Sequence, residues 1–412
     1  MQAGFGWIDF SEGHRDRVFS VVELLSADGS VDELGVGVVR DAIADWLFPG
    51  VSTIQTCPKY FIIIPQIFLS YLKKFYNKEK LPVLKEYVRN EEHRIMNQLS
   101  KNYNYTENNY IIGVNVAKNN GELARKPTSI YWNGLRKHGI IATNYSFSEF
   151  VHHNDLSKYH HSGHKDENAE DEMASFDENF GIKCPDFEGI DATSRMELTE
   201  DEAHYLKDQF ISTNGSVKQK GNLLSQILQS PERIKIILAA NNFVQLAEAL
   251  LKDSELNDDT KKILEIALDF DFLIHGAHIR YNIQLHKKAG NRAVEFEKKW
   301  DEWIEILEEI KPNIQELNFD FIFTELAPRT GPETQKFMKD WQTEVLQPQL
   351  NCETLDILVK KQEFNKKHGK AKLTSSKGEY SEWVGLNRLQ YRFSQVKKII
   401  VDINTANAKS KK

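Results

Sequence analysis

Apolar residues recur every three to four positions through most of the chain, which is the spacing of helices. In one such stretch Leu84, Val88, Ile95 and Leu99 share a face, and the stretch begins near Pro82, a residue favoured in the first turn of a helix. The pattern therefore predicts a helix over residues 82–100, with most of its charges on the opposite side.

Start signals predict further helices near the N-terminus. Ser11 begins one, and the capping box of residues 30–33 begins another, which stops at Pro49-Gly50. In a capping box, a serine hydroxyl and a glutamate carboxylate bind each other's backbone amides. Here those two residues are Ser30 and Glu33.

The second half of the chain is predicted to be mostly helical. Residues 199–202 form another capping box, and residues 258–289 contain no proline, so they predict one long helix. Gly290-Asn291 then predicts a short turn into a helix that runs through Glu309. The apolar face of this last helix is typical of an antiparallel helical pair.

Two short strands are expected in the first half. Residues 107–121 are rich in tyrosine, isoleucine and valine before Asn119-Asn120-Gly121, which predicts a strand entering a turn. Residues 125–147 predict a capped helix, a stop at Gly139 and a second short strand.

Residues 151–182 differ from the rest because they are polar, acidic and nearly without aliphatic side chains, which predicts a solvated linker. The expected fold class is mostly α. A helical domain with a small β element (1–150) is joined by this polar linker (151–182) to a helical domain (183–350) and a basic C-terminal segment (351–412).

Composition limits the class of protein. The net charge is −7, so binding to a polyanion must come from a local patch. The three cysteines have no CxxC spacing, which argues against a zinc ribbon or a disulfide framework. The most apolar run, residues 60–72, is shorter than the roughly 20 residues of a spanning helix, and the N-terminus lacks the features of a signal peptide. We expect a cytoplasmic protein with no membrane association and no cofactor.

The helix predicted near residue 130 is a candidate nucleic-acid site. Basic residues surround the aromatic pair Tyr131-Trp132, and a basic helix followed by a strand is how winged-helix modules present their reading element. The basic residues are Arg125, Lys126, Arg136 and Lys137. The alternative is a core helix whose charges are solvated.

The loop of residues 46–61 is a weak candidate for an anion site. Ser52, Thr53 and Thr56 supply hydroxyls near a helix start, and Lys59 follows them. Cap preferences favour a structural elbow instead, in which Pro49-Gly50 ends one helix and Ser52 or Thr53 caps the next. The GxxxxGK[ST] motif is absent from the chain, which argues against a nucleotide-hydrolysing protein.

His275 and His278 are the only weak candidates for metal ligands. They share a helix face, and Asp271 lies one turn earlier. A metal-dependent hydrolase or nuclease would need a third ligand, which the sequence does not indicate, so a buried polar pair is the favoured interpretation. The histidine-rich tract of residues 152–164 is interpreted as a flexible polar insert, because spacing without a fold fixes no metal geometry.

The strongest charge signal lies between residues 360 and 398, where 11 basic and 3 acidic residues give a net charge of +8. Aromatic residues are interspersed and could stack on bases. The candidate nucleic-acid-binding residues here are Lys366, Lys367, Lys370, Lys372 and Arg392. The alternative is that this segment docks on the acidic remainder of the same protein.

The stretches "FGWIDFS", "DELGVGVVRDAIADWLFPGVSTIQT", "RKPTSIYWNGLRKHGI", "LTEDEAHYL" and "HGAHIRYN" resemble an uncharacterised bacterial family, catalogued as domain of unknown function 6361. The resemblance runs nearly end to end. It implies a component encoded beside helicase-type and phospholipase-D-like proteins in genome-defence clusters, which is an association only.

The expected function is a non-enzymatic accessory protein of a prokaryotic defence system. It would engage nucleic acid, DNA or RNA, or a helicase or phospholipase-D-like partner. Two alternatives remain open at this point: a metal-dependent hydrolase using His275 and His278, and a pure protein-protein scaffold.

Overall fold

A computed structural model describes residues 32–77, 79–106, 110–119, 121–157, 180–187, 191, 193–213, 222–290, 293–374, 380 and 382–409. The chain forms two compact units. The first contains Met1–Trp46 and Asn241–Tyr391, and the second contains Leu47–Ala240 and Arg392–Lys412. This grouping differs from the linear division into segments that the sequence predicted, because each unit combines remote stretches of the chain.

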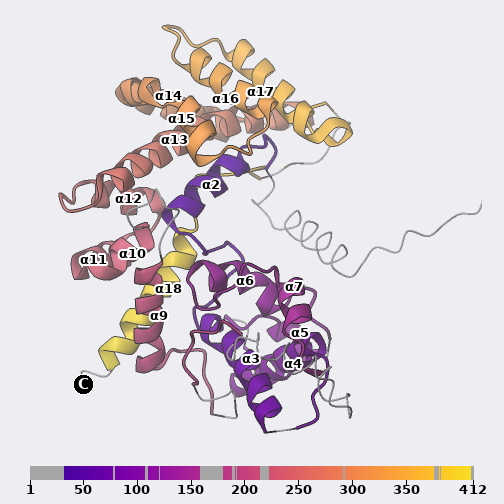
Figure 1. Ribbon diagram of the computed structural model, residues 1–412. Helices are drawn as coiled ribbons and strands as arrows, with labels where there is room; N and C mark the ends of the chain where they lie inside the picture. The colour runs from indigo at the N-terminus through magenta and orange to yellow at the C-terminus, as the bar shows by residue number, and fades with distance from the viewer. Residues whose placement is uncertain are drawn as a thin grey trace, which may run out of the picture. The chain divides into compact units, whose positions relative to one another are not determined.

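Figure 1 shows that both units are built from helices, which confirms the mostly α class. The helices of the first unit are α2 (Gly37–Leu47, ending at the unit boundary), α12 (Phe243–Leu251), α13 (Asp258–Ala289), α14 (Val294–Glu316), α15 (Phe319–Phe321), the π-helix η3 (Ile322–Leu326), α16 (Pro332–Val345), α17 (Cys352–Lys367) and the 3-10 helix η4 (His368–Lys370).

The second unit contains α3 (Tyr60–Tyr76), α4 (Leu84–Asn102), α5 (Val114–Lys118), α6 (Pro127–Lys137), α7 (Phe147–His153), α9 (Glu200–Ser212), α10 (Leu223–Gln229), α11 (Pro231–Ala239) and α18 (Phe393–Lys409). The last of these returns from the C-terminal end of the chain to pack along α9 (Figure 1).

In the first unit, α13 is the central helix, and α14 packs along it as the predicted antiparallel partner. Gly276 allows the close approach, because a Cβ at this position would lie 2.5 Å from the Trp303 ring. The indole nitrogens of Trp303 and Trp341 donate to the carbonyls of Phe272 and Leu273, each at 2.9 Å. These aromatic side chains therefore bury both their area and their polar atoms against one helix.

In the second unit, α6 lies against the loop that precedes α3. The Tyr131 hydroxyl accepts from the amides of Thr56 and Cys57 and donates to the Cys57 carbonyl. Gly50, at φ +80°, meets α6 at Gly134, where a Cβ on Gly134 would lie 2.6 Å from the Gly50 carbonyl oxygen. The loop is thus a structural element held by backbone contacts.

Several predicted helix signals are confirmed. The long helix over residues 258–289 is present with the predicted bounds, and Gly290 ends it in a left-handed conformation. Thr199 and Glu202 form the predicted capping box of α9. The helix α6 begins at Pro127, and Gly139 follows its end at φ +67°.

Other local predictions are wrong. Residues 114–118, expected in a strand, form the helix α5, because Gly113 at φ +86° turns the chain and Val114 and Ala117 share a buried side. The helix expected from residue 30 begins at Gly37, where Asp32 accepts from the amides of Val36 and Gly37. Ser30 and the helix expected from Ser11 lie outside the described residues.

The winged-helix element is not confirmed. The described residues after α6 contain only an isolated antiparallel bridge, between Ile141 and Ile182. At the ends of the predicted linker, residues 151–153 complete α7 and residues 180–182 pack in the same unit; the stretch 158–179 lies outside the described residues.

We expect Gly50→Val to destabilise the second unit strongly. A Cβ at Gly50 would lie 2.8 Å from His138 Nε2 and 3.2 Å from the Gly134 Cα, and a β-branched residue cannot easily adopt φ +80°. Gly139→Val is the matched control, because Gly139 also has a positive φ but has nothing within 4 Å of its Cβ position. Thermal melts should show a clearly larger loss for Gly50→Val; equal losses would show that the contact with α6 contributes nothing.

Asp269 on α13 predicts a pH dependence of stability. Burial, with repulsion from Glu265 and Glu316, raises the pKa of this carboxyl from 3.8 to about 6. The neutral form is favoured in the folded state, so its contribution is full below pH 3.8 and is lost as the pH rises through 6. Urea unfolding at pH 5 and 7.5 should show that the free energy of unfolding falls with rising pH in the unsubstituted protein. It should fall by less in the Asp269→Asn variant. The exposed Asp301→Asn should leave it unchanged, and an Asp269→Asn profile like that of the unsubstituted protein would contradict the prediction.

Candidate nucleic-acid interface

Two lysines of the basic C-terminal segment are bound to a buried acid. Glu33 is 2% exposed, and its carboxylate oxygens lie 2.5 Å from Lys372 Nζ and 3.4 Å from Lys367 Nζ. An ion removed from water in this way requires its partners, because an unpaired buried charge costs several kcal/mol. For these two lysines, the structure matches the alternative interpretation, in which the basic segment docks on acidic residues of the same protein.

The acid nearest to these lysines along α17 faces inward. Glu363 is 0% exposed and accepts hydrogen bonds from the Tyr281 hydroxyl and from the amides of Lys372 and Leu373. Its charge is therefore compensated by donors inside the unit. The surface of the second half of α17 and of η4 carries basic residues with no exposed acid among residues 357–370.

One face of α17 and η4 remains open, and we call it the α17 face. Its members share a helical side or follow it directly, and all are exposed: Lys360, Lys361, Phe364, His368 and Lys370. The Phe364 side chain is 49% exposed, with its ring 6.2 Å from that of His368. The three lysines form no ion pair or hydrogen bond with a described residue. Of this set, the sequence prediction had named only Lys370 as a site residue.

The other basic residues predicted in this segment have structural contacts. Lys366 is half-buried, and its aliphatic chain covers Gly35, whose Cβ position lies 2.7 Å from Lys366 Cδ. Arg392 belongs to the second unit, where it donates to the Val51 carbonyl.

The aromatic pair on α6 is part of the core. Tyr131 is 0% and Trp132 is 6% exposed, so neither ring can stack on a base. Arg136 donates to the carbonyls of Thr143 and Asn144 at 3.1 and 3.0 Å. Lys137 is exposed, and Arg125 and Lys126 are half-exposed at the start of the helix. The arrangement fits the core-helix alternative better than a reading helix.

The loop proposed as an anion site does not gather its hydroxyls. Thr56 Oγ1 donates to the Tyr110 carbonyl, and the Thr53 carbonyl accepts from Gln395. The Ser52 amide binds the Gln55 side chain, and α3 begins only at Tyr60, so neither Ser52 nor Thr53 caps it.

The ammonium that would support an anion there is already paired. Lys59 is 6% exposed and binds both carboxylate oxygens of Glu202, at 2.6 and 2.7 Å. A charge pair buried this deeply makes the Lys59 ammonium unavailable to a phosphate in the loop.

The histidine pair on α13 lies in a packed environment. His278 is 1% exposed, and its Nδ1 lies 3.0 Å from the Ile274 carbonyl. The His275 ring stacks on Trp383, with centroids 5.4 Å apart. Burial lowers the pKa of His275 to about 3 and also lowers that of His278, so both rings are neutral at pH 7.

The carboxylate one turn before the histidines is also occupied. Asp271 accepts from Arg388 Nε and from the Leu389 amide, each at 2.6 Å. Across the described residues, no group of three or more His, Cys, Asp or Glu side chains could hold a metal ion. His152 and His153 end α7, whereas the other histidines of the polar tract lie outside these residues.

No helix in the described part of the chain has both the length and the apolar character needed to cross a membrane. No curated protein and no solved structure matches the chain. One family model, described as "Family of unknown function (DUF6361)", matches residues 2–316. Because this match covers well over half of the sequence, the chain belongs to the family of unknown function DUF6361.

Proposed function

We propose that this protein is a non-enzymatic accessory protein that binds single-stranded nucleic acid through the α17 face. The observation that carries this proposal is an exposed phenylalanine on the same face as three exposed lysines, none of which pairs with a described acid. An aromatic ring beside cations offers a base a stacking partner and offers the backbone its counter-charge. The phenyl ring has no hydrogen-bonding group and the lysines carry flexible point charges, so the expected binding is largely independent of sequence.

Single strands are favoured over duplexes for a physical reason. Phe364 can stack only on a base whose face is accessible, and bases in a duplex are covered by their neighbours. The lysines at positions 360, 361 and 370 can contact phosphates of either form, so a duplex should bind through charge alone. A role in prokaryotic genome defence, with a helicase or phospholipase-D-like partner, remains part of the proposal and rests on the family resemblance.

The test is a titration of labelled single-stranded and duplex DNA and of RNA at two salt concentrations. The triple variant Lys360→Glu, Lys361→Glu and Lys370→Glu should weaken single-strand binding at least tenfold at low salt. It should also reduce the slope of log affinity against log salt by about 2, since each lost phosphate contact contributes about 0.7. Phe364→Ala should weaken single-strand binding about 5- to 100-fold and leave duplex binding nearly unchanged.

Matched controls come from the same unit. The double variant Lys298→Glu and Lys336→Glu reverses two highly exposed lysines outside the α17 face, so it tests the effect of net charge alone. Its affinity for nucleic acid should stay within about twofold of that of the unsubstituted protein. Lys367→Glu with Lys372→Glu should instead lower the melting temperature, because Glu33 loses both partners. If the unsubstituted protein binds no nucleic acid at low salt, or the triple variant binds as well as it does, the protein-protein scaffold becomes the better account.

A further inference from the structure

The second unit contains an open pocket that none of the features above uses. Its volume is about 360 Å³, within the roughly 300–1,000 Å³ typical of small-molecule sites. It lies between α4 and the segment that leads into α6. The lining residues are Arg89, Asn90, Glu92, His93, Glu122, Leu123 and Lys126.

Glu92 is the buried polar group of this pocket. It is 4% exposed, and its Oε1 accepts from the amide and the hydroxyl of Thr128, at 2.7 and 2.6 Å. Both bonds end on Oε1, and Oε2 makes none with a described residue. Glu92 therefore holds the first turn of α6 with one oxygen and leaves the other for a further partner.

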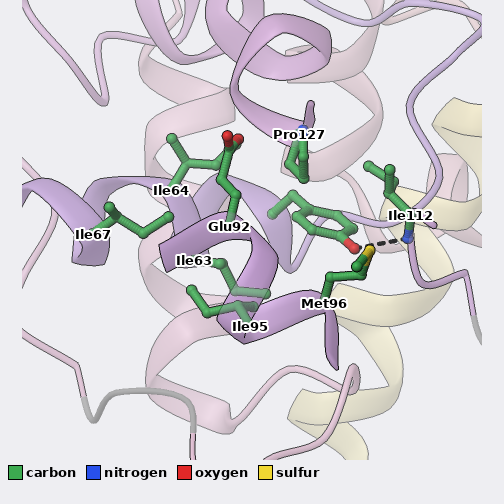
Figure 2. A pocket seen from close by; sticks show the side chains of 9 residues that line it. Ile63, Ile64, Ile67, Glu92, Ile95, Met96, Ile112 and Pro127 are labelled. Atoms are coloured by element: carbon green, nitrogen blue, oxygen red, sulfur yellow. Dashed lines mark hydrogen bonds between the residues drawn. The ribbon is translucent and has the colours of Figure 1, made fainter. Parts of the chain in front are cut away.

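The surroundings of Glu92 on its other side are apolar. There it borders a cavity of about 10 Å³, whose remaining walls are formed by Tyr60, Ile63, Ile64, Ile67, Ile95, Met96, Ile112 and Pro127. Figure 2 shows the Glu92 carboxylate turned away from the Ile63 and Ile95 side chains, at the edge of this apolar cluster. Burial in such surroundings raises the pKa of Glu92. The carboxyl group thus lies at the border between this apolar cluster and the lining of the open pocket.

Two cations stand at the rim of the same pocket. Arg89 is exposed one turn before His93 on α4, and Lys126 is half-exposed directly before α6. Neither forms an ion pair with a described residue. The charge of Lys126 acts on the pKa of Glu92 and opposes the rise caused by burial, so the two groups lie near each other. The rim is therefore suited to a phosphate group.

The remaining lining groups complement a base. Glu92, Glu122 and Asn90 provide carboxyl and amide oxygens that accept from N–H groups, and Leu123 and the His93 ring provide apolar and planar surface. A ligand that uses both halves must carry an anion at one end and N–H donors on a planar group at the other. The volume is large enough for such a two-part molecule.

We propose that this pocket binds a nucleoside monophosphate, with the phosphate on Arg89 and Lys126 and the N–H groups of the base on Glu92, Glu122 and Asn90. This site lies in the second unit and does not depend on the α17 face. Its failure would leave the proposed nucleic-acid interface unaffected, and the reverse also holds.

The test measures binding to the full chain by titration calorimetry, with cytidine and guanosine monophosphates as the first probes. Cytidine, guanosine and inorganic phosphate, at equal ionic strength, supply each half of the ligand alone. At least one monophosphate should bind saturably and at least tenfold more tightly than either of its halves, because linked groups lose their freedom of motion only once. A site that merely attracts anions would bind inorganic phosphate as tightly as the nucleotide, and this result would overturn the proposal.

Variants separate the two halves of the site. Arg89→Ala and Lys126→Ala should each weaken nucleotide binding at least fivefold without weakening nucleoside binding. Glu92→Gln keeps an oxygen for Thr128 but replaces the free acceptor with a donor, so it should weaken both while retaining a near-native melting temperature. Lys101→Ala, at the exposed end of α4, is the control and should bind as the unsubstituted protein does. The proposal would be wrong if neither monophosphate bound saturably. It would also be wrong if all three pocket variants bound the nucleotide as tightly as the unsubstituted protein does.

Discussion

A single buried carboxylate, that of Glu33, joins the N-terminal and C-terminal parts of the first unit. It has almost no contact with water, so it requires the ammonium groups of Lys367 and Lys372, which lie more than 300 positions later in the chain. These pairs hold the segment before α2 against α17. They also withdraw positive charge from the surface, so the charge density of the C-terminal sequence overstates what a partner can reach.

The same arrangement recurs with other acids of the molecule. Glu363 is satisfied by a tyrosine hydroxyl and two amides, Glu202 by Lys59, and Asp271 by Arg388 and an amide. Each carboxylate joins elements that are distant in sequence. Removing its partner should lower the free energy of unfolding more than removing one partner of a surface ion pair does. Glu92 differs from these because one of its oxygens forms no hydrogen bond with a described residue, and it lines a pocket large enough for a ligand.

The local structure could be predicted where the sequence carries local signals. The capping box at Thr199, the proline start of α6 and the glycine after α13 act within a few residues, so the pattern alone identifies them. The strand expected within residues 107–121 is wrong at residues 114–118, because β-branched residues also fit a short buried helix and the turn at Gly113 starts one there.

The partners of charged residues could not be predicted in this way. Lys59 was considered as support for an anion, and nothing near it in sequence reveals Glu202, 143 positions later. One signal was available, however. Glu92 lies four residues after Val88 and three before Ile95, so it occupies the apolar stripe of its helix, where a charged residue indicates a buried role. Glu363, four residues after Val359, follows the same rule.

The division of the chain has a consequence for biosynthesis. Neither unit is one continuous stretch: the first joins residues before 47 to residues after 240, and the second requires α18, at residues 393–409. On a ribosome that delivers the chain from its N-terminus, Glu33 emerges long before its lysines, and α9 long before the helix that covers it. The core of the first unit is therefore complete only after residues 241–391 have left the ribosome, and that of the second only after residues 393–409 have done so. Until then, unfinished apolar faces are exposed to aggregation.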